Sequence, residues 1–164
     1  MSLKLEEQVP SLELCKKLKS LSYPQEGLFY WQIETSDSEF LKRYKIERFK
    51  DILITDSEKR TSDRYWKGKK LKLSYEHFVA PTVAEMGERL PYQLFVGSPS
   101  KHDSYHLEIF MNSDKEFSYS YYDDSTSEIL HDTENCKTEA NARAKMLIWL
   151  VENKHLSFKG ERDL

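Results

Sequence analysis

The sequence is poor in the residues that mark linkers, repeats and disulfide scaffolds. It has five glycines and five prolines among 164 residues, so it contains no collagen-like or linker-like stretch. Its two cysteines, Cys15 and Cys136, lie far apart, whereas a small secreted scaffold has more cysteines at closer spacing. We therefore interpret both cysteines as small hydrophobic residues with reduced thiols, and we expect a cytoplasmic protein.

Long apolar runs are absent too. No run approaches the roughly 18 residues that a membrane-spanning helix needs. The first residues alternate leucine with lysine and glutamate, and they lack the apolar segment of a signal peptide. We therefore expect neither a signal peptide nor a membrane as a partner.

The motifs of common enzymes are missing. The sequence contains no GxxxxGK[ST], GxGxxG, GxSxG, HExxH or CxxC pattern, which disfavours the usual nucleotide-dependent and hydrolytic enzymes. The one local pairing of a nucleophile with a base is Cys136 with His131. The neighbouring Asp132 and Glu134 would raise the pKa of that thiol and so work against a reactive thiolate. We assign no catalytic residue and favour a non-enzymatic protein.

A metal site is not predicted either. His102 and His106 lie near Asp103 and Glu108, and two histidines with a carboxylate can ligate zinc. Their spacing matches no common zinc pattern, so we interpret them as surface residues and expect no cofactor. The paired carboxylates Asp123–Asp124 lie in a predicted turn, where they serve turn geometry.

What the sequence does contain is typical of a folded domain. It is 38% hydrophobic and 13% aromatic, which argues for a real core and against disorder. Its length favours one domain, which buries roughly 70% of the surface that the unfolded chain exposes. We predict a single α+β domain over residues 1–156 and a polar tail over 157–164.

Three helices are predicted, over Ser11–Leu21, Thr82–Leu90 and Thr138–Asn153. In each, a serine or threonine at the first position offers its hydroxyl to the free N–H groups of the first turn. Thr82 and Glu85 have the spacing of a capping box. In the last helix the apolar positions form one stripe: Ala140, Ala144, Leu147 and Val151. Asn153 is predicted to take the left-handed conformation after that helix, and Gly87 to permit close packing on a strand.

Strands are predicted where bulky β-prone residues cluster or alternate with polar ones. They cover residues 28–33, 52–54, 71–79, 92–96, 105–111, 117–121 and 129–131. Residues 40–55 fit either a pair of strands or a helix followed by a strand, and 58–68 are predicted to be a loop. In the 117–121 strand we expect the aromatic residues to point inward and Ser118 and Ser120 to point outward.

These elements predict a mostly antiparallel sheet of four to six strands. Two main helices would pack on one face, and the short helix would cross an end, which defines the α+β class. The predicted core is Leu14, Leu18, Leu21, Phe29, Trp31, Val83, Met86, Leu107, Ile109, Phe117, Tyr119, Ala144, Leu147 and Val151.

Charge is distributed unevenly along the chain. Residues 41–72 hold twelve lysines and arginines against five acids, a net charge of +7, although the whole chain is −3. Cations with interleaved aromatic residues are typical of a nucleic-acid-binding surface. The candidate residues for binding nucleic acid or a protein partner are Lys42, Arg43, Lys45, Arg60, Arg64, Tyr65, Trp66, Lys67, Lys69 and Lys70.

The alternative interpretation uses the acidic segment 112–139, which has a net charge of −6. In this interpretation the basic segment 41–72 neutralises the acidic segment, either within one chain or between associating chains. A small enzyme with an unfamiliar pocket that acts on nucleotides stays open as a third interpretation.

Three segments together resemble a known group of proteins. They are KKLKS with the later FYW (residues 16–20 and 29–31), APTVAEMGERLP (80–91) and TEANARAKMLI (138–148). They are similar to small bacteriophage and prophage proteins with the order "KKLKELG…Q…FYW", "APTVAELGE.LP" and "TEANARAKMLIYL". The resemblance implies a shared fold and a mobile-element origin, and it implies no activity or site residue. The basic segment lies where this pattern is shortest, so the resemblance implies an insertion there.

Overall fold

The computed structural model describes residues 4–36, 51–58, 63–66, 69–72, 74–98 and 101–158. Its helices are η1 (Leu5–Glu7), α1 (Leu12–Ser20), η2 (Asp56–Glu58), α3 (Val83–Gly87) and α4 (Glu139–Glu152). Its strands are β1 (Phe29–Glu34), β2 (Ile52–Thr55), β3 (Asp63–Trp66), β4 (Lys69–Lys72), β5 (Tyr75–Val79), β6 (Gln93–Ser98), β7 (Lys101–Met111), β8 (Phe117–Asp123) and β9 (Glu128–Asp132).

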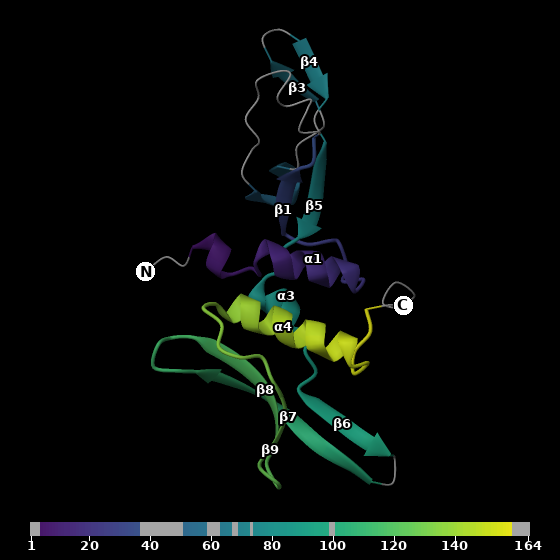
Figure 1. Ribbon diagram of the computed structural model, residues 1–164, viewed down its shortest axis with the longest axis vertical. Helices are drawn as coiled ribbons and strands as arrows, with labels where there is room; N and C mark the ends of the chain where they lie inside the picture. The colour runs from purple at the N-terminus through teal and green to yellow at the C-terminus, as the bar shows by residue number, and fades with distance from the viewer. Residues whose placement is uncertain are drawn as a thin grey trace.

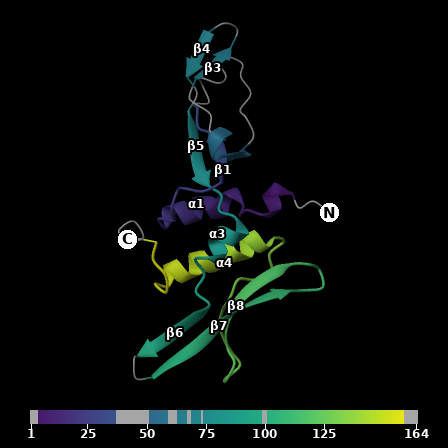
Figure 2. The same cartoon turned by 180° about the vertical axis from the view of Figure 1, so that it is seen from behind.

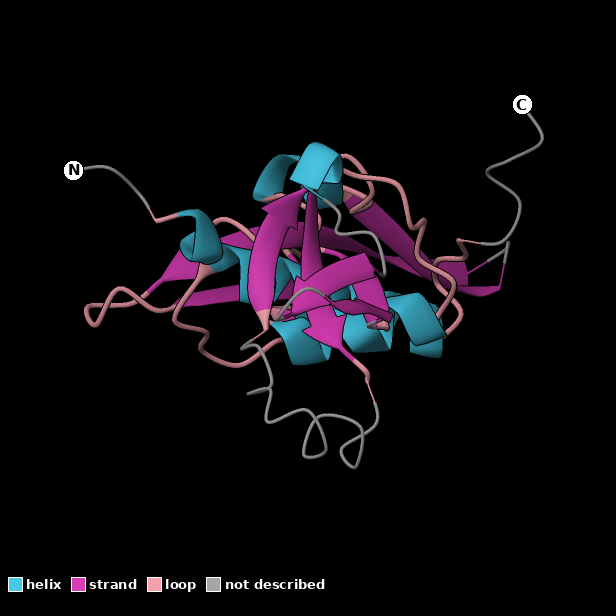
Figure 3. Cartoon of the chain, turned by 90° about the horizontal axis from the view of Figure 1, so that it is seen from above, coloured by secondary structure: helices cyan, strands magenta, loops and turns pink. Residues whose placement is uncertain are grey.

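The fold is α+β, as predicted, and its layers are stacked along the long axis of the molecule. A three-stranded antiparallel sheet, in the order β2-β1-β5, lies above α1 in Figure 1, and a four-stranded antiparallel sheet, β6-β7-β8-β9, lies below α4. The view from behind keeps this order (Figure 2), and the view from above superimposes the layers (Figure 3). The helices therefore lie between two sheets and do not share one face of a single sheet.

This middle position explains the composition of α4. The helix packs on β8, α1 and α3, so more than one of its faces must be apolar. The predicted stripe holds for Ala140, Ala144 and Leu147, whereas Val151 is only partly buried. Residues outside the stripe are buried as well: Ala142, Met146, Ile148 and Leu150.

The described residues form two apolar clusters. The main one joins α4 to the four-stranded sheet and α3, and it reaches α1 and the three-stranded sheet through Leu18, Tyr30, Ile54 and Val79. The smaller one joins α1 to the three-stranded sheet around Val9, Cys15, Phe78 and Ala80. Most of the predicted core residues are buried or packed against these clusters. Ile109 is the exception, since 55% of it is exposed. It pairs with the fully buried Tyr119 and lies two residues before the end of β7.

Several local predictions need correction. Ser118 and Ser120 are buried and not exposed, and they lie on the central strand pair opposite Phe110 and Glu108. The predicted loop 58–68 contains strand β3, and the predicted strand 71–79 is divided between β4 and β5. Phe158, placed in the polar tail, is buried with its ring 5.0 Å from that of Tyr23.

The ends of the helices follow the predicted pattern with two exceptions. The Ser11 side chain makes no capping bond, and its backbone N–H donates to Asn141 Oδ1 at 2.8 Å. Asn153 keeps a negative φ of −92°, and Lys154 takes the left-handed conformation with φ 63°. None of the helices in the described part of the chain is long and apolar enough to cross a membrane.

Candidate functional site

The basic segment contains a two-stranded antiparallel ribbon. Strands β3 and β4 pair with Tyr65 opposite Lys70 and Trp66 opposite Lys69. In the described ranges these two strands pair only with each other, so they form a sheet of their own. Strands β2, β3 and β4 are all extended, so the helical alternative does not apply to these residues.

The structure brings half of the candidate binding residues onto this ribbon. They are Arg64, Tyr65, Trp66, Lys69 and Lys70. The other candidates lie outside the described residues: Lys42, Arg43, Lys45, Arg60 and Lys67. Figure 1 shows the ribbon at one end of the molecule, beyond the three-stranded sheet. The ribbon is therefore a basic and aromatic element set apart from the helical layer.

The acidic segment lies at the opposite end. The segment 112–139 contains β8 and β9, which lie below α4 in Figure 1, and its last residue, Glu139, begins α4. Their carboxylates include the exposed Asp124, Glu128, Asp132 and Glu134. For the described residues, this arrangement argues against neutralisation of the ribbon by the acidic segment of the same chain. It leaves a molecule with a basic end and an acidic end.

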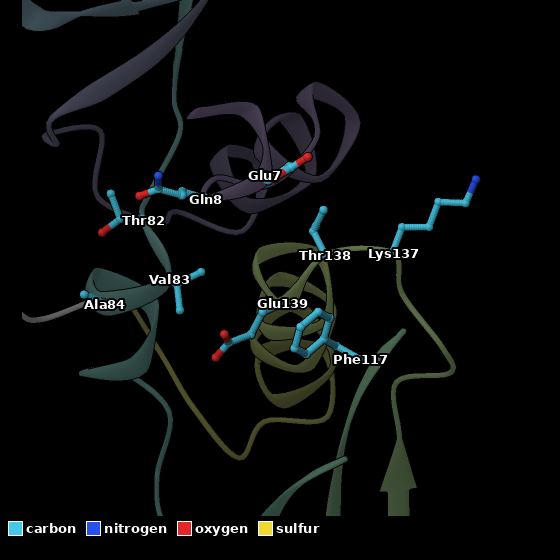
Figure 4. A pocket seen from close by; sticks show the side chains of 9 residues that line it. All are labelled: Glu7, Gln8, Thr82, Val83, Ala84, Phe117, Lys137, Thr138 and Glu139. Carbon is cyan, nitrogen blue, oxygen red and sulfur yellow. The ribbon is translucent and has the colours of Figure 1, made fainter. Parts of the chain in front are cut away.

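A cleft opens beside the N-terminal ends of two helices. Its volume is about 640 Å³, and Figure 4 shows its lining side chains. They come from η1, α3, the start of β8 and the start of α4: Glu7, Gln8, Thr82, Val83, Ala84, Phe117, Lys137, Thr138 and Glu139. The predicted caps Thr82 and Thr138 are confirmed here, because Thr82 accepts from Glu85 N at 3.2 Å and Thr138 from Asn141 N at 3.2 Å.

Glu139 is held in place on the wall of this cleft. Its Oε1 accepts from the Tyr119 hydroxyl at 2.8 Å and from Arg143 Nε and Nη2 at 3.0 and 2.7 Å. Tyr119 is fully buried, and burial, followed by its bond to Glu139, raises the pKa of its phenol. The tyrosine therefore stays protonated at neutral pH and acts as a fixed donor to the carboxylate.

Gly87 allows this arrangement. A Cβ on Gly87 would collide with Nη1 of Arg143. The close packing predicted for this glycine is thus present, but the partner is an arginine of α4 and not a strand. From the sequence alone, Glu139 is predicted only to stabilise its helix as an acidic residue at the positive end of the helix dipole. The spacing of Glu139 and Arg143, four residues apart on a helix, is a local signal for the pair, whereas the contact with Tyr119 has none.

The cysteines have the buried character expected of small hydrophobic residues. Cys15 and Cys136 are both buried and free. Burial raises the pKa of Cys15 to about 12, and burial also raises that of Cys136. Cys136 Sγ donates to the Glu134 carbonyl at 3.6 Å, while His131 stacks on Trp149. Neither thiol is a ready nucleophile.

Of the histidine and aspartate candidates, Asp103, His106, Asp123 and Asp124 line a hollow of about 290 Å³. Within the described ranges, no three His, Cys, Asp or Glu residues are placed to hold a metal ion. Asp123 has the predicted turn role, since its Oδ1 accepts from Ser125 and Thr126. These hydrogen bonds, led by the Ser125 side chain, lower the pKa of its carboxyl.

Comparison with known proteins gives no match. No protein-family model matches the chain, no curated protein is similar to it, and no solved structure matches its fold. The functional conclusion therefore rests on the residues and geometry of this chain.

Proposed function

We propose that this chain is a cytoplasmic, non-enzymatic binding protein that contacts double-stranded nucleic acid with the β3–β4 ribbon. The observation that carries the proposal is the pairing of a basic, aromatic stretch into a separate ribbon at one end of the molecule. The resemblance of its other segments to phage and prophage proteins fits an accessory role in a mobile element.

The dimensions of the ribbon suit a DNA groove. Two paired strands lie about 4.8 Å apart, and four residues of a strand span about 13 Å. The major groove of B-DNA, about 12 Å wide, admits a two-stranded ribbon. Lysine and arginine contacts to phosphate then supply affinity without reading sequence. The ribbon carries four such cations: Arg64, Lys69, Lys70 and Lys72.

The acidic end supports an oriented encounter. The chain has a net charge of −3, which alone disfavours binding to a polyanion. Because the basic and acidic segments lie at opposite ends, the field of the molecule turns the ribbon toward phosphate and the β8–β9 end away from it. Overall acidity is therefore compatible with binding through one end.

A second candidate function follows from the same separation of charge. The basic end of one copy can pair with the acidic end of the next, in a head-to-tail contact that does not close on itself. This would make the chain an oligomerising assembly component. The enzymatic alternative gains less support, because the carboxylate of Glu139 on the wall of the described cleft disfavours a nucleotide phosphate.

The experiment is fluorescence anisotropy with labelled single- and double-stranded oligonucleotides, together with sedimentation of the protein alone at the same salt concentrations. We expect saturable binding to duplex DNA by a protein that sediments as a monomer. Absence of binding at low salt would overturn the proposal. Salt-sensitive growth of oligomers without DNA would favour the assembly function instead.

A further inference from the structure

We propose that the cleft beside Glu139 is a binding site for a small molecule that carries a primary amine or guanidinium on an apolar body. The site lies between α3, α4 and β8, and the β3–β4 ribbon takes no part in it. The inference does not rest on the proposed contact with nucleic acid.

The walls of the cleft provide the apolar part. Val83 and Ala84 project from α3, and the ring of Phe117 lies beside Glu139 at the start of α4 (Figure 4). A volume of about 640 Å³ falls within the range of roughly 300–1,000 Å³ that is usual for small-molecule pockets. An aromatic or branched aliphatic group would therefore lose water against these three side chains.

Glu139 provides the recognition of a cation. All the hydrogen bonds that described residues give to this carboxylate go to Oε1. Oε2 is left with no donor from that part of the chain, and the side chain is 31% exposed. A ligand ammonium or guanidinium can donate to Oε2 in a charge-assisted hydrogen bond without displacing Arg143 or Tyr119.

The carboxylate is already oriented before any ligand arrives. Arg143 is only 17% exposed at its side chain, and its guanidinium occupies the space left by Gly87. Tyr119 reaches Glu139 from the buried face of β8. Because these groups hold the carboxylate from two sides, a ligand does not have to order it on binding.

The preference of the cleft for a cation over an anion comes from Glu139 and not from the charged groups of the rim. Glu7 lies on the rim, but its carboxylate extends away from Glu139 (Figure 4) and accepts from Lys4 N at 3.4 Å. Lys137 is exposed, and Figure 4 shows its side chain extending away from Val83 and Glu139. An anionic ligand of the same shape would meet Glu139 without a facing cation, because Arg143 already pairs with that carboxylate.

The test uses three probes with the same phenyl body and different head groups: 2-phenylethylamine, 2-phenylethanol and 3-phenylpropanoate. Each is titrated into the ¹⁵N-labelled full chain, and backbone amide shifts are followed by NMR. We expect saturable shifts at Val83, Ala84, Thr138 and Glu139 with the amine. The alcohol should bind at least about tenfold more weakly, because it lacks the charged hydrogen bond, and the propanoate should not bind.

Two variants locate the site. Ala84→Trp adds a large side chain at an exposed lining residue of the cleft and should abolish the amine shifts, whereas the matched Ala84→Ser should retain them. In Glu139→Gln the amine and the alcohol should bind with similar affinity. Glu7→Gln should weaken binding of the amine less than Glu139→Gln does. Unchanged amide shifts elsewhere confirm that each variant is folded.

Equal binding of the amine and the propanoate would overturn the proposal. So would amine shifts that persist in Ala84→Trp or that map to the acidic β8–β9 end. Amine binding without any binding of DNA would sustain this inference and refute the proposed function, and the reverse result would do the opposite.

Discussion

The imidazole of His131 stacks on the indole of Trp149, with 4.3 Å between ring centroids and 1° between ring planes. A second imidazole, that of His155, stacks on the same indole at 5.1 Å and 29°. The three rings come from β9, α4 and the segment that follows α4. They join the edge of the four-stranded sheet to the C-terminal end of the central helix.

The stack predicts that acid weakens the fold through His131. Burial lowers the pKa of His131, and the nearby Asp132 opposes this only in part. In the unfolded chain the pKa is about 6.5, so the unfolded state takes up a proton first as pH falls. The contribution of His131 to stability is therefore present above about pH 6.5 and is lost as pH falls through the lowered folded value.

Urea unfolding of wild type and His131→Phe between pH 7.5 and 5.5 measures this effect. The phenylalanine keeps an aromatic ring against Trp149 but cannot be protonated, so the variant should lose less stability on acidification. His155→Phe is the matched control from the same stack. An identical pH dependence in wild type and His131→Phe would contradict the assignment.

Gly27 is predicted to be intolerant of a side chain. A Cβ there would lie 2.6 Å from Cγ2 of Val79, a β-branched residue that is 1% exposed. Gly27→Ala should therefore destabilise the protein by about 1–3 kcal/mol, the usual cost of overpacking. In a Val79→Ala background the clash is removed, so the same change should cost less. Equal costs in the two backgrounds, measured by urea unfolding, would show that the close approach is not the cause.

The three helix caps are predicted to differ in how much they stabilise the protein, although the sequence predicts a cap at each helix. Thr82 and Thr138 each accept a backbone N–H, whereas the Ser11 hydroxyl makes no capping bond. Thr82→Ala and Thr138→Ala should each cost about 1 kcal/mol of unfolding free energy. Ser11→Ala should cost much less, as measured by urea unfolding, and a cost equal to that of the threonine variants would contradict the observed geometry.

Features set by nearby residues were predictable from the sequence. The capping box of Thr82 and Glu85 depends on residues three positions apart, and both of its hydrogen bonds are present at 2.7 and 3.2 Å. The stripe around Ala144 and Leu147 likewise follows from helical periodicity. The α+β class follows in turn from the number and type of such elements.

Features set by distant residues were not predictable. Ile109 and Tyr119 are paired on adjacent strands, yet Tyr119 is fully buried and Ile109 is 55% exposed. The alternation of side chains along β7 predicts which face of the sheet Ile109 lies on. It does not predict whether another element covers Ile109 there. The site around Glu139 was not predictable for the same reason, because it depends on Tyr119 and Gly87, which lie on other elements. Strand β3 was missed because the segment 58–68 around it is polar and because the strand pairs only with β4, outside the main sheets.

The most direct test of the central claim is the salt dependence of duplex binding, measured by fluorescence anisotropy for wild type and Lys69→Gln/Lys70→Gln/Lys72→Gln. The matched control is Lys16→Gln/Lys17→Gln on α1, where both lysines form surface ion pairs. We expect log affinity to fall linearly with log salt, with a slope that the ribbon variant reduces by about 0.9 for each phosphate that the substituted lysines neutralise in wild type. The α1 variant should keep the wild-type slope. Equal slopes for wild type and the ribbon variant, or no binding at low salt, would contradict the assignment of β3–β4 as the nucleic-acid contact.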